Sequence, residues 1–318
     1  DASGTSALTL EGEFSTRALE LCSINRSSNP ELVSSGEVIG SVLEGTIPGL
    51  EGIPVVAGGA DNASAAFGCG VEWPGDTMVS LGTSGTVVAV TNSAVPDTTG
   101  GIHLFRHVSS DSFYHMAVIL SATNSLNWFK ERFAGEIELG EIEAIVSGTP
   151  VGSNGIIFLP YLNGERTPHR DPNARGTLFG FSSFHGKGDV FRSIYEGVAF
   201  ALREGADLIK RLGTSIERIR IVGGGSRSDT WCQIIADNLG REVWSPRVDE
   251  GAAYGSARLA AMAMGLESDS WIKLDRCFTP NCEGKDVYDA IFEIYRGLYS
   301  SLKENFLVLG ELQKRLVK

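Results

Sequence analysis

The sequence predicts an α/β fold in which a mixed β-sheet is flanked by helices. Between residues 77 and 119, short apolar runs follow one another with turn residues between them, as in a sheet built from hairpins. From residue 156 onwards, such runs alternate with longer segments whose apolar residues recur every three or four positions, as in helices. Hairpins followed by strand–helix–strand–helix alternation are typical of a mixed sheet with helices packed on it.

The periodicity predicts the individual elements and their ends. Apolar runs predict strands at 37–42, 53–56, 77–81, 86–90, 102–106, 113–119, 156–159, 218–222 and 242–244. Helical spacing predicts helices at 14–21, 62–67, 124–133, 136–146, 189–212, 226–239, 250–264 and 284–308. Gly213 and Gly240 follow two of these helices directly, as glycines that end helices do. The polar segment 160–176 is predicted to be a long loop, and loops of this kind often carry function.

Composition restricts the class of protein. The 318 residues are 42% hydrophobic and 21% charged, which is ordinary for globular proteins of about two domains. No apolar run reaches the roughly 20 residues of a membrane span. A net charge of −12 argues against sequence-independent binding to nucleic acid or to an acidic membrane. The five cysteines form no CxxC pair, which fits a reducing, cytoplasmic location.

Residues 1–72 are expected to be the tail of a domain whose main body lies elsewhere in a longer protein. Residues 1–52 contain one predicted short helix, 14–21, and one predicted strand, 37–42, and neither alone buries much of a core. The chain also begins with Asp1 rather than Met, so it reads as the interior of a longer sequence. The VEWPGD segment, residues 71–76, is predicted to be a turn, a domain boundary and one strand of a hinge. Residues 73–318 then form the second domain.

Two turns carry residues suited to phosphoryl transfer. Asp61 is an isolated acid between a small-residue turn and a small-residue helix, where it can accept a proton from a hydroxyl group or, alternatively, cap the helix. The GTSG turn at 82–85 joins two strands and offers backbone N–H groups to phosphate oxygens, although hairpins also use such residues for turn geometry alone. An acid and an amide-rich turn are the parts that phosphoryl transfer needs.

A third turn, Gly223-Gly224-Gly225, joins a predicted strand to a predicted helix. Glycines allow a phosphate to approach the backbone, and the start of a helix offers free N–H groups to an anion. The turn lacks the lysine of a P-loop, and Ser228 replaces the third glycine of a dinucleotide fingerprint, so tight packing is the alternative explanation. The five histidines show no metal-ligand spacing, and we predict no metal ligand in this chain.

These turns, taken together with their neighbours, resemble the FGGY carbohydrate kinases of the actin-like ATPase (ribonuclease H-like) superfamily. The resemblance covers nearly the whole chain, and the PYLNGERTPH segment looks most like the xylulokinase branch. It implies an actin-like nucleotide-binding domain, with a fragment of a second such domain at the N-terminus. The segments that carry it are GIPVVAGGADNASAAFG (52–68), PGDTMVSLGTSGTV (74–87), FLPYLNGERTPHRDPNARG (158–176), EGVAFALREG (196–205), IRIVGGGSRSDTWCQIIADNLG (219–240) and EGAAYGSARLAAMAMG (250–265).

The resemblance implies a role for each matching residue. Asp61 matches the catalytic base, which takes the proton from the sugar hydroxyl, and Asn62 matches a sugar contact. Gly82 and Thr83 match the loop around the β- and γ-phosphates of ATP. The implied nucleotide contacts further along the chain are Thr123, Asn127, Gly224, Gly225 and Asp229.

The chain departs from the family pattern in two ways. The Asp-x-Gly-Thr phosphate loop that opens the family's N-terminal domain, and whose acid helps to hold Mg²⁺, is absent. Asp229 also stands where relatives often have a neutral residue, which leaves its contact open. We therefore expect residues 1–318 alone to bind nucleotide weakly and to leave sugar unphosphorylated. The terminal helix either caps the domain or meets a partner, so a homodimer remains open.

The implied function is ATP- and Mg²⁺-dependent phosphorylation of a ketopentose, D-xylulose at its terminal hydroxyl group. Within the same chemistry, ribulose, gluconate, glycerol or a deoxy sugar is the alternative substrate. A non-catalytic actin-like relative that binds sugar or nucleotide is the alternative from another class. Such a relative has no chemical reason to keep Asp61, which is the feature that separates the two readings.

Overall fold

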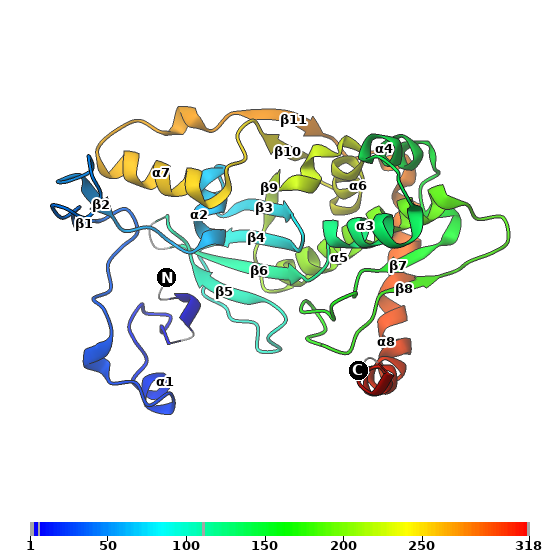
Figure 1. Ribbon diagram of the computed structural model, residues 1–318, viewed down its shortest axis with the longest axis horizontal. Coiled ribbons are helices and arrows are strands. Elements are labelled where there is room, and N and C mark those ends of the chain that lie inside the picture. Colours follow the sequence, from blue (N-terminus) through cyan, green and yellow to red (C-terminus); the bar gives the residue numbers. More distant parts are fainter. Residues whose placement is uncertain (1–2, 6, 110–111, 317–318) are drawn as a thin grey trace.

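The computed structural model describes residues 3–5, 7–109 and 112–316 (Figure 1). Most of the predicted elements are confirmed in kind and in order. The strands are β1 (Val38–Ser41), β2 (Pro54–Val56), β3 (Gly75–Leu81), β4 (Gly85–Thr91), β5 (His103–Arg106), β6 (Phe113–Ile119), β7 (Ile157–Leu159), β8 (Thr177–Phe179), β9 (Ile216–Val222), β10 (Val243–Pro246) and β11 (Leu274–Phe278). The helices are α1 (Thr16–Leu21), α2 (Asp61–Gly68), α3 (Thr123–Phe129), α4 (Leu139–Gly148), α5 (Lys187–Arg211), α6 (Asp229–Leu239), α7 (Gly251–Ala263) and α8 (Lys285–Leu316).

A seven-stranded mixed sheet forms the centre of the molecule. Its strand order is β11-β10-β9-β3-β4-β6-β5. The pairs β10/β9 and β9/β3 are parallel, whereas β3/β4 and β4/β6 are antiparallel. Strands β3, β6, β9 and β10 therefore run in the same direction, and their carboxyl ends lie on the same side of the sheet. The turns that follow these strands lie on that side, which is where ligands bind in open α/β sheets.

Helices cover both faces of this sheet, as predicted. Side chains alternate along the strands, so that Val79 and Val87 face one core while Met78 and Val88 face the other. The first core is completed by α5 and α6, and the second by α2 and α7. Figure 1 shows α2 and α7 side by side at one end of the sheet.

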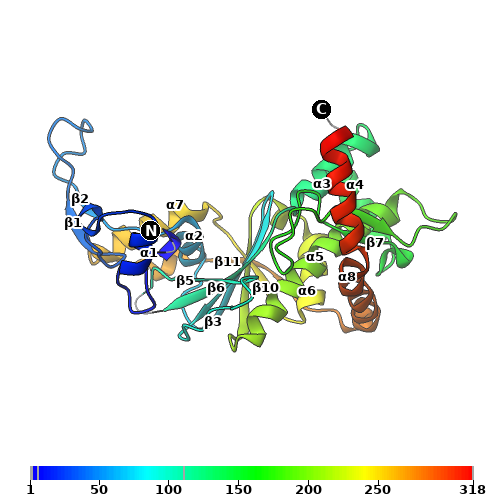
Figure 2. The same ribbon diagram turned by 90° about the horizontal axis from the view of Figure 1, so that it is seen from below.

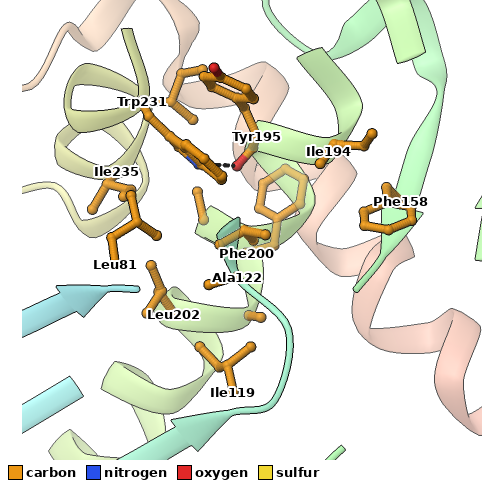
Figure 3. Packing of buried hydrophobic residues seen from close by; sticks show 14 of the residues in the cluster. Leu81, Ile119, Ala122, Phe158, Ile194, Tyr195, Phe200, Leu202, Trp231 and Ile235 are labelled. Carbon is orange, nitrogen blue, oxygen red and sulfur yellow. Dashed lines mark hydrogen bonds between the residues drawn. The ribbon is translucent and has the colours of Figure 1, made fainter. Parts of the chain in front are cut away.

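The larger core fixes α5 and α6 beneath the ends of the strands. The rings of Tyr195 on α5 and Trp231 on α6 stack with their centroids 4.1 Å apart. The indole N–H of Trp231 also donates a hydrogen bond of 3.1 Å to the Tyr195 carbonyl group. Figure 3 shows Leu81, the last residue of β3, in the same cluster. The turn after β3 is thus supported by packed aromatic side chains.

Two smaller sheets lie outside the central one. β1 pairs with β2, and β7 pairs with β8, both antiparallel. Figure 2 shows β1, β2 and α1 at the opposite end of the molecule from α8. Among the described helices, none is both long enough and apolar enough to cross a membrane.

Some boundaries and two strands differ from the sequence prediction. β8 has only three residues, and β11 reads Leu-Asp-Arg-Cys-Phe at the sheet edge, so neither shows an apolar run. Helix α6 begins at Asp229 rather than at residue 226. The glycine turn first forms the 3-10 helix Gly224–Arg227, and the Ser228 hydroxyl then caps α6 by accepting the Trp231 N–H at 3.0 Å.

Candidate active site

An open groove lies beside the carboxyl ends of β3, β9 and β10. Its volume is about 640 Å³. One wall is the start of α2, and the other comprises the ends of β3, β9 and β10, the start of α7 and part of β11. The residues that line it are Asp61, Asn62, Ala65, Met78, Ser80, Val222, Gly223, Gly224, Ser226, Arg227, Pro246, Arg247, Asp249, Glu250, Gly251, Ala252, Asp275 and Arg276.

Asp61 begins α2 and is exposed in the groove. Its Oδ1 accepts hydrogen bonds from the Asn62 backbone N–H at 2.8 Å and from the Asn62 side-chain amide at 3.1 Å. Within the described part of the chain, Oδ2 has no hydrogen-bond partner. The helix cap is Ala60, which makes no side-chain capping bond, so the capping alternative for Asp61 is wrong. Asp61 lies one residue too late, inside the first turn, where its negative charge still suits the helix dipole.

The turn at residues 82–85 is tied to the start of α3. The Gly82 carbonyl group accepts hydrogen bonds from the Thr123 N–H and the Thr123 hydroxyl group, both at 2.9 Å. The Thr83 carbonyl group accepts one from the Ala122 N–H at 2.9 Å. These bonds bring Gly82, Thr83 and Thr123 together, as the resemblance implies. The hydrogen bonds to the Gly82 and Thr83 carbonyl groups connect the turn to the start of α3.

The glycine turn after β9 lies directly against the end of β3. Gly223 has a φ of +91°, and a Cβ there would come within 2.9 Å of the Leu81 carbonyl oxygen. A Cβ on Gly225 would come within 2.5 Å of the Leu81 side chain and 2.9 Å of Thr123. Gly224 has open space around it and faces the groove. Side chains are thus excluded at the two flanking positions, while the middle glycine leaves the backbone accessible to a ligand.

Of the predicted nucleotide contacts, Gly224 is part of the groove lining, whereas six others lie outside it: Gly82, Thr83, Thr123, Asn127, Gly225 and Asp229. Asn127 is exposed, one helical turn beyond the start of α3. Asp229 is the first residue of α6 and forms an ion pair with Arg276 of β11. Arg276 also donates a hydrogen bond of 2.9 Å to the Ser226 carbonyl group. The contact of Asp229, which the sequence left open, is with Arg276 of the same chain.

The sequence interpretation missed Asp249 and the arginines of the groove. Asp249 follows β10, and its Oδ2 accepts the Gly223 N–H at 2.6 Å. Arg227, Arg247 and Arg276 add positive charge to the lining. Asp249 could have been found from its position just after a strand of the parallel part of the sheet, where ligand-binding residues concentrate.

Neither the loop at 160–176 nor the described acids form a metal centre. Glu165 of this loop is buried against the end of β6, where its Oε1 accepts the Leu120 N–H at 3.1 Å. Burial raises the pKa of the Glu165 carboxyl group to about 8. Among the described residues, no three His, Cys, Asp or Glu side chains lie close enough together to hold a metal ion. We assign no metal ligand among these residues.

Comparisons with known proteins agree on one family. Residues 77–264 match the C-terminal domain of the FGGY family of carbohydrate kinases, and residues 1–68 match its N-terminal domain. The xylulose kinase of Bacillus subtilis is 36% identical over 99% of this chain, which spans 65% of that protein's length.

Solved structures show the same fold. A xyloylose kinase from Brucella ovis superposes with a TM-score of 0.87 at 32% identity, covering 96% of this chain and 64% of the other. A gluconate kinase from Lactobacillus acidophilus reaches 0.88 at 23% identity, covering 95% and 63%, which shows the fold alone. The predicted actin-like ATPase fold, a mixed sheet flanked by helices, is therefore confirmed. The chain belongs to the FGGY family of carbohydrate kinases.

Proposed function

We propose that the protein containing this chain transfers the γ-phosphoryl group of ATP to a ketopentose, D-xylulose, at its terminal hydroxyl group. The observation that carries the proposal is that Asp61 and Gly224 line the same groove. An acid and an open glycine turn that share one groove can hold a hydroxyl nucleophile and a phosphate chain next to each other. The names of the relatives, xylulose kinases at up to 36% identity, support the choice of sugar.

In this mechanism Asp61 is the general base. Its Oδ1 is held by two hydrogen bonds from Asn62, which leaves Oδ2 to accept the proton of the sugar hydroxyl group. A carboxylate is basic enough because the transition state is loose, so that positioning matters more than basicity. Asn62 lines the groove beside Asp61, where its amide can contact the sugar.

The nucleotide is proposed to lie along the edge of the sheet. Gly82, Thr83 and Thr123 surround the β- and γ-phosphates, and Gly224 and Gly225 flank the α-phosphate and adenosine. Gly224 is exposed and lines the groove, and the described residues show no acceptor for its N–H group, which can therefore bind a phosphate oxygen. Asn127 and Asp229 are weaker candidates, because Asn127 lies one helical turn beyond the start of α3 and the Asp229 carboxylate is paired with Arg276. The arginines of the groove can balance the phosphate charge.

The same proposal divides the chain at residue 72. Residues 1–72 would belong to the sugar-binding domain and residues 73–318 to the nucleotide-binding domain, with the turn at 71–76 as one strand of the hinge. Closing the two domains on the sugar would exclude water, which otherwise competes as the phosphoryl acceptor.

A sugar panel tests the proposed substrate. ADP release by the full-length protein is measured in a coupled assay with ATP, Mg²⁺ and either D-xylulose, D-ribulose, D-gluconate or glycerol. We expect the highest kcat/KM with D-xylulose. A higher kcat/KM with another member of the panel would reassign the substrate within the family. ADP release that no sugar or polyol increases would contradict the kinase proposal.

A further inference from the structure

Asp249 makes a contact that no step of the proposed mechanism uses. It lies in the connection between β10 and α7 and lines the groove. Its Oδ2 accepts the backbone N–H of Gly223 at 2.6 Å, a short bond of the charge-assisted kind. Because Gly223 directly follows β9, this bond fixes the first peptide of the glycine turn.

The glycine turn depends on that bond for its orientation. The Gly223 carbonyl group is held on its other side by the Ser226 N–H at 3.0 Å. With its N–H held by Asp249 and its carbonyl group held by Ser226, Gly223 keeps its φ of +91°. The next residue, Gly224, lines the groove.

The segment that carries Asp249 is also fixed to the helix that carries Asp61. A Cβ on Gly255 of α7 would lie 1.8 Å from the Ser64 carbonyl oxygen of α2, so the two backbones are in direct contact. Arg258 of α7 is fully buried and donates a 2.5 Å hydrogen bond to the Phe67 carbonyl group of α2. Helix α7 therefore connects the acid of one wall to the glycine turn of the other.

We propose that Asp249 is a positioning residue: its hydrogen bond to Gly223 holds the turn at residues 223–225 in a fixed position relative to Asp61. This inference rests on the proposed function, because it concerns where the nucleotide lies relative to the base. It assigns the Asp249 carboxylate to the Gly223 N–H and gives it no contact with sugar or phosphate. The bond should therefore affect nucleotide affinity and kcat while the KM for the sugar stays constant.

Two substitutions at one position test this role in the full-length protein. Asp249→Ala removes the acceptor, whereas Asp249→Asn keeps an oxygen acceptor and removes only the charge. We expect the alanine variant to bind ADP about five- to tenfold more weakly in calorimetry, as for the loss of one hydrogen bond, with a lower kcat. The asparagine variant should stay within about twofold of wild type. Glu242→Ala, an exposed acid just before β10 and outside the groove lining, is the charge control.

The outcomes separate this inference from the function on which it rests. Unchanged ADP affinity and kcat in Asp249→Ala would overturn the positioning role. If Asp249→Ala and Asp249→Asn lost ADP affinity and kcat equally, the hydrogen bond to Gly223 would not be the cause of the positioning role. A wild-type protein that binds no ADP would contradict the proposed function instead. If the alanine variant does not fold, hydrogen exchange in the wild type decides: the Gly223 amide should exchange at least about tenfold more slowly than that of Gly224, and equal rates would overturn the inference.

Discussion

Glu165 has a buried carboxyl group that accepts hydrogen bonds from two backbone N–H groups and, within the described residues, forms no ion pair. Its Oε1 accepts the Leu120 N–H at 3.1 Å and the Arg166 N–H at 2.7 Å, while its Oε2 has no partner among the described residues. Burial raises its pKa to about 8, and a second buried acid, Glu204, adds to this rise. Burial also raises the pKa of Glu204 to about 7, although Arg296 and Arg211 oppose that effect. The folded chain therefore holds protons that the unfolded chain releases at lower pH.

The free energy of unfolding should fall as pH rises from about 4.5, the ordinary pKa of a glutamate, towards 8. Glu165→Gln keeps the shape and the acceptor but cannot ionise. We expect this variant to lose less stability than wild type between pH 5 and pH 8, measured by urea unfolding. Glu304→Gln, an exposed acid on α8, should show the wild-type pH dependence. Parallel curves for wild type and Glu165→Gln would contradict a buried acid with a raised pKa.

The sequence predicted some site residues at this scale and missed others for a physical reason. Asp61 and Gly224 stand beside small residues in distinctive turns, and both line the groove. The alternative that Asp61 caps the helix is wrong because α2 starts one residue earlier than that alternative requires, and the sequence does not fix the first residue of a helix so closely. Asp249 has no distinctive neighbours, and its contact with Gly223 spans 26 residues.

At the scale of elements, α2 and α7 show that the sequence pattern predicts a helix but not the helix that it packs against. The sequence pattern predicted helices at 62–67 and 250–264, and both helices are present. Their mutual contact is a tertiary feature that neither pattern specifies. β11 was missed because an edge strand with charged residues shows no apolar run, although it supplies Arg276 to the groove.

Substituting a glycine at this contact should destabilise the protein. Gly255→Ala places a Cβ 1.8 Å from the Ser64 carbonyl oxygen, so α2 and α7 must separate. We expect a loss of about 2 kcal/mol or more in the free energy of unfolding, as for overpacking of a tight core. Gly297→Ala is the matched control, because this glycine lies within α8 with open space around it. That change should stabilise the protein by about 0.5–1 kcal/mol, and equal effects of the two substitutions would contradict the close contact.

At the scale of the whole molecule, the groove joins regions far apart in the sequence. Asp61 comes from residues that match the family's N-terminal domain, whereas Gly224 and Asp249 come from residues that match its C-terminal domain. The order of motifs along the chain predicted the family and the fold. It could not predict the geometry of the groove, because the relative positions of the two walls depend on how α2 packs on α7 and on the sheet.

The most direct test of the account is the activity of Asp61→Asn in the full-length protein. Asparagine keeps the size of the side chain but cannot accept the hydroxyl proton as a base. We predict that kcat for D-xylulose falls by at least about 100-fold, while the Kd for ADP stays within about twofold of wild type. Asp286→Asn, an exposed acid at the start of α8, should leave kcat unchanged. A kcat within about threefold of wild type for Asp61→Asn would contradict the role of this acid as the catalytic base.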